Sequence, residues 1–217
     1  MRKIFITGFR HSGTTMLHQL VKTHPQVGFI EDESSYIEYD KPVEWILMFA
    51  KKKVPDLKNY AWGEKLPWGN RKTDVNGIRP VNFINKWLKY FKKEARVLHI
   101  LRHPVDAILS TGIGKIEGYD WNLIINTVPI VIDCLNMDKR CATVVYEDLV
   151  SSPEIHLNNI FHFLDLESNQ TIIRNVVNTQ LKFGKINAER AFAFRNKKNI
   201  SVNFDYESLI KRVKIRL

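Results

Sequence analysis

The fold of this protein is most readily recognised in residues 5–20, FITGFRHSGTTMLHQL. The run KIFIT at residues 3–7 is short and apolar, as in a strand that is buried in a sheet. A polar loop bounded by Gly8 and Gly13 follows, and residues 14–22 then repeat apolar side chains at helical spacing. Strand, tight loop and helix in this order predict an anion cradle, because a helix begins with unpaired backbone N–H groups and a positive dipole end.

The side chains of this loop also suit an anion. Ser12, Thr14 and Thr15 supply hydroxyl donors at the first turn of the expected helix. Arg10 adds a permanent positive charge, and His11 adds one that depends on pH. The alternative is an ordinary glycine-containing turn between a strand and a helix, which accounts less well for the run of hydroxyls.

The loop differs from the nucleoside-triphosphatase pattern G-x-x-x-x-G-K-[ST], because Thr14 stands at the lysine position. That lysine contacts the β- and γ-phosphates, and an acidic residue at the end of another apolar strand helps to hold magnesium. Here the clearest other strand, residues 96–101, is followed by Arg102, His103 and Pro104. Both differences argue against Mg-dependent transfer of a γ-phosphoryl group.

Apolar runs and helical periods alternate along the rest of the chain. Further strands are expected at residues 27–30, 96–101 and 143–146, and helices at residues 43–52, 81–91, from 104, 122–137 and 153–164, with a loop after residue 52. Pro129 is expected to kink its helix or to mark the start. We therefore predict an α/β fold: a single domain over residues 1–217 with a central parallel sheet flanked by helices, as a P-loop-like three-layer sandwich. Ligands bind such sheets at the carboxyl ends of the strands.

The composition is that of a soluble globular protein, with 44% hydrophobic and 26% charged residues in a chain of 217. Two cysteines fit a reducing compartment, and the longest apolar runs are too short to span a bilayer. The first strand follows Met1 so closely that no signal peptide is expected. A cytoplasmic location is the resulting prediction.

The positive charge is concentrated in a basic C-terminal segment, residues 182–217. This segment holds ten Lys and Arg against three acids, a balance of +7 out of the net +10. One interpretation is an anionic partner, such as a polyphosphorylated cofactor, an acidic polymer or a nucleic acid. The other interpretation is a solvated surface that keeps the protein dispersed. Charge alone favours this second interpretation, so nucleic acid is not expected as a partner.

Two motifs resemble those of sulfotransferases that use 3′-phosphoadenosine 5′-phosphosulfate (PAPS). GFRHSGTTML at residues 8–17 resembles their 5′-phosphosulfate loop, and ILRHPVDAILST at residues 100–111 resembles their 3′-phosphate motif, which matches Arg102 and Ser110. Ser110 is expected about six residues into a helix, roughly 9 Å along its axis. If that helix packs across the nucleotide, the guanidinium and the hydroxyl can grip one phosphate from two sides.

Three further stretches resemble the tyrosylprotein and bacterial branch of the family. They are KTHPQVGFIEDESS at residues 22–35, WGEKLPWG at residues 62–69 and VVYEDLVSSPE at residues 144–154. The two phosphate motifs are specific, and these three are supportive.

The resemblance implies metal-independent, in-line transfer of a sulfuryl group from PAPS to a hydroxyl or amine, with adenosine 3′,5′-bisphosphate (PAP) as product. It does not identify the acceptor, which could be a small molecule, a glycan or a protein. The implied cofactor-binding residues are Arg10, His11, Ser12, Gly13, Thr14, Thr15, Arg102 and Ser110. No metal ligand is implied.

The catalytic residues that the resemblance implies are an acid near the first helix, a lysine and the basic residue of the loop. Glu33 is the preferred general base and Glu31 the second choice, with Asp32 between them, although all three could form a solvated acidic turn. Lys65 is the candidate for stabilising charge on the leaving group, or else one exposed lysine among many. His11 stands where the family has Lys or Arg, so either Arg10 reaches in or a protonated His11 acts, which would make the rate pH-dependent near neutrality.

Two other functions remain open from the sequence. A P-loop nucleotide kinase or hydrolase would bind ATP with magnesium. A non-enzymatic basic module would bind nucleic acid or an anionic polymer with steep salt dependence.

Overall fold

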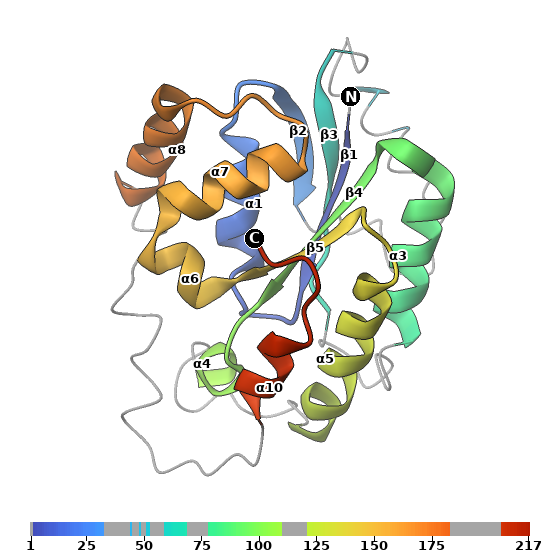
Figure 1. The fold of residues 1–217 in the computed structure, drawn as a ribbon. Helices are drawn as coiled ribbons and strands as arrows, with labels where there is room; N and C mark the ends of the chain where they lie inside the picture. The colour runs from blue at the N-terminus through green and yellow to red at the C-terminus, as the bar shows by residue number, and fades with distance from the viewer. Residues whose placement is uncertain are drawn as a thin grey trace.

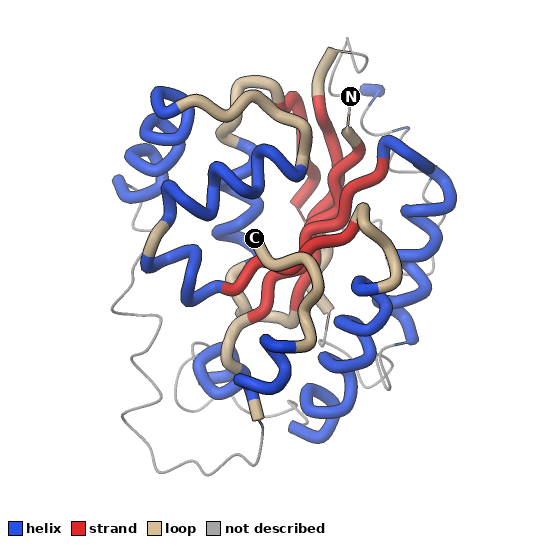
Figure 2. The backbone as a smooth tube through the Cα atoms, viewed as in Figure 1, coloured by secondary structure: helices blue, strands red, loops and turns tan. Residues whose placement is uncertain are grey.

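The computed structural model describes residues 2–32, 59–68, 78–109, 121–182 and 205–217, together with residues 44, 48, 51 and 52. A parallel sheet runs through the centre, with helices on both of its faces (Figures 1 and 2). Its strands are β1 (Lys3–Gly8), β2 (Val27–Asp32), β3 (Ala61–Lys65), β4 (Ala95–Leu101) and β5 (Cys141–Val145), in the order β2-β3-β1-β4-β5. Every described pairing is parallel, so the carboxyl ends of all these strands meet at one edge.

Two hydrophobic cores lie on opposite faces of this sheet. The helices are α1 (Thr14–Lys22), α3 (Ile78–Phe91), η2 (Lys92–Glu94), α4 (Pro104–Leu109), α5 (Trp121–Asn136), α6 (Tyr146–Ser151), α7 (Pro153–Phe163), α8 (Gln170–Lys182) and α10 (Tyr206–Lys211). Side chains of α3, α5 and α10 cover one face, and those of α1, α6, α7 and α8 cover the other. Because side chains alternate along a strand, Phe5 enters the first core whereas Ile4 and Ile6 enter the second. The predicted three-layer α/β fold is confirmed.

The inner strand β3 corrects the loop that was expected after residue 52. Residues 61–65, AWGEK, contain a glycine and two charged side chains, and so carry no apolar run. All of them are nevertheless buried, because β3 lies between β1 and β2. A Cβ at Gly63 would lie 1.7 Å from the carbonyl oxygen of Ile4, so the packing of β3 on β1 requires glycine. Position in the sheet, rather than local hydrophobicity, makes this segment a strand.

Most other expected elements agree with the structure within a few residues. The strand expected at residues 143–146 is β5, which ends at Val145, and Tyr146 already begins α6. Pro129 lies inside α5 and does not mark its start. Of the helix expected at residues 43–52, positions 44, 48, 51 and 52 are described, and they are helical.

The C-terminal residues pack across both the edge and the end of the sheet. The N–H of Thr143 donates to the carbonyl of Ile215 over 2.9 Å, and the N–H of Leu217 donates to the carbonyl of Thr143 over 3.0 Å. Residues 215–217 thus pair with the outer edge of β5. Helix α10 inserts Tyr206 and Leu209 into the core on the α3 and α5 side. None of the helices in the described ranges has the length and apolar character that a membrane span requires.

Candidate anion-binding site at the carboxyl ends of the strands

The loop between β1 and α1 folds back on itself at the carboxyl edge of the sheet. The N–H of Ser12 donates to the carbonyl of Phe9 over 3.0 Å, and the Ser12 hydroxyl donates to the same oxygen. His11 and Gly13 both have left-handed backbones, with φ of 63° and 102°. Gly13 directly precedes α1, so the loop delivers the first turn of that helix to the strand ends.

The segment after β3 fixes the outer side of this loop. The N–H of Arg10 donates to the carbonyl of Trp68 over 2.9 Å, and the N–H of Trp68 donates to the carbonyl of Gly8 over 3.0 Å. Trp68 is fully buried, and its ring packs edge-on against Phe9 with centroids 5.3 Å apart. Trp68 is therefore a packing residue of the loop, and the segment after β3 supports the backbone of the candidate anion site.

Lys65, at the end of β3, lies at the start of α1. Its side chain is 1% exposed, and its Nζ donates to the hydroxyl of Thr15 over 3.3 Å. The alternation of side chains along β3 explains this contact. Lys65 faces α1, whereas the preceding side chain, Glu64, faces the opposite side of the sheet. Two predicted site residues from separate motifs are therefore in contact, and a buried lysine lies beside the first helical turn.

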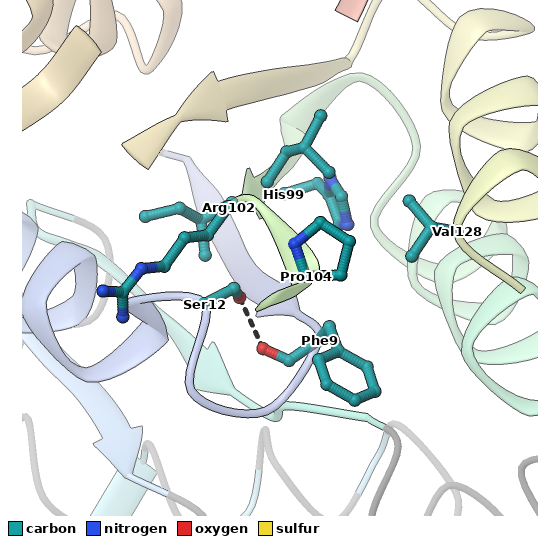
Figure 3. A pocket seen from close by; sticks show the side chains of 8 residues that line it. Phe9, Ser12, His99, Arg102, Pro104 and Val128 are labelled. Atoms are coloured by element: carbon teal, nitrogen blue, oxygen red, sulfur yellow. Dashed lines mark hydrogen bonds between the residues drawn. The ribbon is translucent and has the colours of Figure 1, made fainter. Parts of the chain in front are cut away.

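Arg102 connects the second motif to the first. It follows β4 directly, and its Nη1 donates to the carbonyl oxygen of His11 over 3.1 Å. The guanidinium carbon lies 4.4 Å from the ring centroid of Tyr146, a cation–π contact. Figure 3 shows this side chain beside Ser12 at the loop. The same Tyr146 ring would be 2.5 Å from a Cβ at Gly13, so the ring packs against both motifs.

The turn after Arg102 is held by Glu147, at the first turn of α6. Its Oε1 accepts the N–H of His103 over 3.0 Å, and its Oε2 accepts the hydroxyl of Tyr206 over 2.8 Å. The rings of His103 and Tyr206 meet edge to face at 4.9 Å. Sequence reasoning missed the roles of Glu147 and Tyr206. The resemblance of residues 144–154 was the one signal that pointed to this region.

A small cavity of about 10 Å³ lies behind the loop, toward α5 (Figure 3). It is lined by Phe9, Ser12, His99, Ile100, Leu101, Arg102, Pro104 and Val128. His99 is 1% exposed and stacks on Trp68, and neither ring nitrogen has a hydrogen-bond partner in the described structure. Burial lowers the pKa of His99 to about 3, so its imidazole is neutral at physiological pH.

The expected general bases are described incompletely. The sequence predicts that Glu31 and Asp32 follow a strand that ends at residue 30, but in the structure they are the last residues of β2. Their backbones pair in register with Glu64 and Lys65. Glu33 and Ser110 lie outside the described residues. The choice of base and the role of Ser110 therefore stay predictions.

The remaining loop residues differ in exposure. Thr14 is buried and Arg10 half-buried, whereas the side chains of His11 and Thr15 are exposed. Within the described ranges no group of three or more His, Cys, Asp or Glu side chains could hold a metal ion, and metal-independent chemistry stays a prediction.

The fold matches that of solved sulfotransferase structures. No family model matches the sequence, and no curated protein matches it. Solved structures do match: a sulfotransferase domain from the curacin biosynthetic pathway has a TM-score of 0.63 at 14% identity, covering 97% of this chain and 95% of that one. The sulfotransferase domain of the Synechococcus PCC 7002 olefin synthase has a TM-score of 0.59 at 16% identity, over 98% and 93%.

A mouse enzyme gives a similar result. Sulfotransferase SULT7A1, solved as a complex with PAP, has a TM-score of 0.52 at 16% identity, covering 97% of this chain and 81% of that one. These identities are low, so the matches establish the fold. The resemblance that the motifs suggest is confirmed at that level.

Proposed function

We propose that this protein is a PAPS-dependent sulfotransferase that transfers a sulfuryl group to a hydroxyl or amine of an acceptor. The observation that carries the proposal is the hydrogen bond from Arg102 to the backbone of His11. It joins two anion motifs that lie about 90 residues apart in the sequence and at two different strand ends. Two convergent anion sites suit a nucleotide with a phosphate on each side of its ribose.

The residues around the loop fit such a ligand. The backbone N–H groups at the start of α1 and the hydroxyls of Thr14 and Thr15 would hold the 5′-phosphosulfate. Arg102, with Ser110, would hold the 3′-phosphate. PAPS supplies the sulfuryl group when bound, and the chain supplies orientation and charge. Lys65 lies buried against Thr15, where its ammonium group would offset negative charge on the leaving phosphate.

The two catalytic roles that involve an acid and His11 remain part of this proposal. Glu33 is the preferred base for the acceptor proton, with Glu31 second. The side chain of His11 is exposed, and its backbone carbonyl is the group that meets Arg102. Position 11 therefore supports the site through its main chain whichever basic side chain, Arg10 or His11, approaches the cofactor.

Titration with PAP tests the binding half of the proposal. Wild-type protein should bind PAP, and Arg102→Ala should weaken binding about 30-fold, because a charge-assisted hydrogen bond contributes about 2 kcal/mol. Calorimetry measures this directly. Arg174→Ala, which removes an exposed arginine from α8, is the matched control and should bind as wild type does. Absence of PAP binding by the wild-type protein would overturn the proposal.

Activity and the two alternatives need separate assays. Labelled PAPS with a panel of hydroxyl and amine acceptors tests sulfuryl transfer. ATP with Mg²⁺ tests a P-loop kinase or hydrolase, which we disfavour because Thr14 stands at the lysine position. Binding of a polyanion over a series of salt concentrations tests a basic binding module. For such a module, Ser12→Ala should not change the affinity for the polyanion.

A further inference from the structure

Glu147 connects the turn after Arg102 to the C-terminal helix α10. Its carboxylate is nearly buried, at 8% exposure, and both of its oxygens are used. Oε1 accepts the backbone N–H of His103, and Oε2 accepts the hydroxyl of Tyr206. An ionised carboxylate only accepts hydrogen bonds, so it matches these two donors without leaving a polar group unsatisfied.

Helix α6 supports Arg102 in two ways from adjacent residues. The ring of Tyr146 lies under the guanidinium, and Glu147 holds the N–H of the peptide unit that follows Arg102. A guanidinium at the end of a long side chain can bind a phosphate well only if its Cα is fixed in place. The contact to His103 supplies that restraint.

We propose that Glu147 is a positioning residue for Arg102, and that α10, through Tyr206, is part of the cofactor-binding apparatus. This inference rests on the proposed function. Glu147 touches no reacting atom in it, and acts on phosphate affinity by fixing the backbone from which Arg102 extends. Tyr206 acts one step further away, because its hydroxyl orients the carboxylate.

Helix α10 is attached independently of the Tyr206 hydroxyl. Leu209 and Ile210 are buried in the core beneath it, and Arg212 pairs with Asp133 of α5, with the Nη2–Oδ1 distance at 2.7 Å. Removing the hydroxyl alone should therefore leave the helix docked. Tyr206→Phe then tests the connection to Glu147 without removing the element that carries it.

The neighbouring acid provides a matched control. Asp148 also binds the C-terminal segment, since Arg216 donates from Nε to its Oδ2 over 3.0 Å. In the described structure this pair makes no hydrogen bond to the turn at His103. Asp148→Ala should lower stability as Glu147→Ala does, but it should leave the support of Arg102 in place.

The experiment measures PAP affinity by calorimetry and thermal stability for each variant. Glu147→Ala should weaken PAP binding about tenfold and Tyr206→Phe a few-fold, whereas Asp148→Ala should bind as the wild type does. Glu147→Gln should recover part of the loss, because its amide oxygen can still accept from His103 and its NH₂ can donate to the Tyr206 oxygen. In an Arg102→Ala background, Glu147→Ala should weaken binding no further.

The outcomes separate this inference from the proposed function. If the wild type binds no PAP, the proposed function fails and the role of Glu147 fails with it. If the wild type binds PAP but Glu147→Ala binds equally well, the function stands and the positioning role is wrong. Equal losses of affinity in Glu147→Ala and Asp148→Ala would indicate a general loss of stability and would also overturn it. If Glu147→Ala does not fold, Tyr206→Phe and Glu147→Gln carry the same comparison.

Discussion

Only glycine suits both the backbone conformation and the close packing at position 13. Its φ of 102° is in the left-handed region, and a Cβ there would lie 2.5 Å from the ring of Tyr146. The same ring carries the guanidinium of Arg102 at 4.4 Å. A side chain at position 13 would therefore strain the loop and displace the support of the second motif at the same time.

His99 should make the stability of the protein sensitive to acid. Burial lowers its pKa to about 3 in the folded protein, against about 6.5 in an unfolded chain. Below pH 6.5 the unfolded chain takes up a proton that the folded protein does not, so stability falls as the pH drops from about 6.5 toward 3. The slope from this group approaches about 1.4 kcal/mol per pH unit.

Urea denaturation at a series of pH values measures this slope. His99→Phe should flatten it, while His162→Phe, at an exposed position of α7, should leave it unchanged. Part of the slope should survive in His99→Phe, because burial also lowers the pKa of His24. An unchanged slope in His99→Phe would show that the ring is protonated in the folded protein or free to leave its site.

At the scale of elements, β3 should tolerate little change at Gly63. Gly63→Ala would place a methyl group 1.7 Å from a backbone oxygen of β1. The main chain cannot move aside without separating the paired strands β3 and β1. We expect the free energy of unfolding to fall by about 4 kcal/mol or more, or the variant not to fold at all. Circular dichroism and denaturation measure it.

The reverse change on the same strand is the control. Ala61→Gly should lower the free energy of unfolding by only about 1 kcal/mol, because it removes one methyl group and raises the backbone entropy of the unfolded chain. A Gly63→Ala protein as stable as Ala61→Gly would contradict the strand pairing of β3 with β1.

The elements that the sequence predicts well are those set by neighbouring residues. The strand, loop and helix of residues 3–22 carry their own apolar periods and glycines, and β4 is mostly apolar. β3 and α6 were not predicted, because distant partners determine them. The site shows the same division: Lys65 and Arg102 were found by motif, but the orientation of Glu147 depends on Tyr206, 59 residues away.

At the scale of the whole molecule, the C-terminal residues act as a closing strand. A chain that ends after Lys214 would lose the hydrogen bonds of residues 215–217 to Thr143 and the ion pair of Arg216 with Asp148. Its β5 edge would present unpaired backbone groups to other chains. We expect a lower melting temperature and concentration-dependent association, measured by calorimetry and light scattering. Lys214→Ala in the full chain should neither lower the melting temperature nor cause association, because the backbone contact of residue 214 to Asn136 is kept.

The bond between Glu147 and Tyr206 also has a consequence for biosynthesis. During translation the loop of residues 8–15 leaves the ribosome first, Arg102 follows, and Tyr206 comes after every other described part of the candidate site. A nascent chain can therefore form this loop early, while β5 still lacks its pairing with residues 215–217 and Glu147 still lacks one of its two donors. Under the proposed function, full affinity for PAP should therefore arise only after Tyr206 has been synthesised.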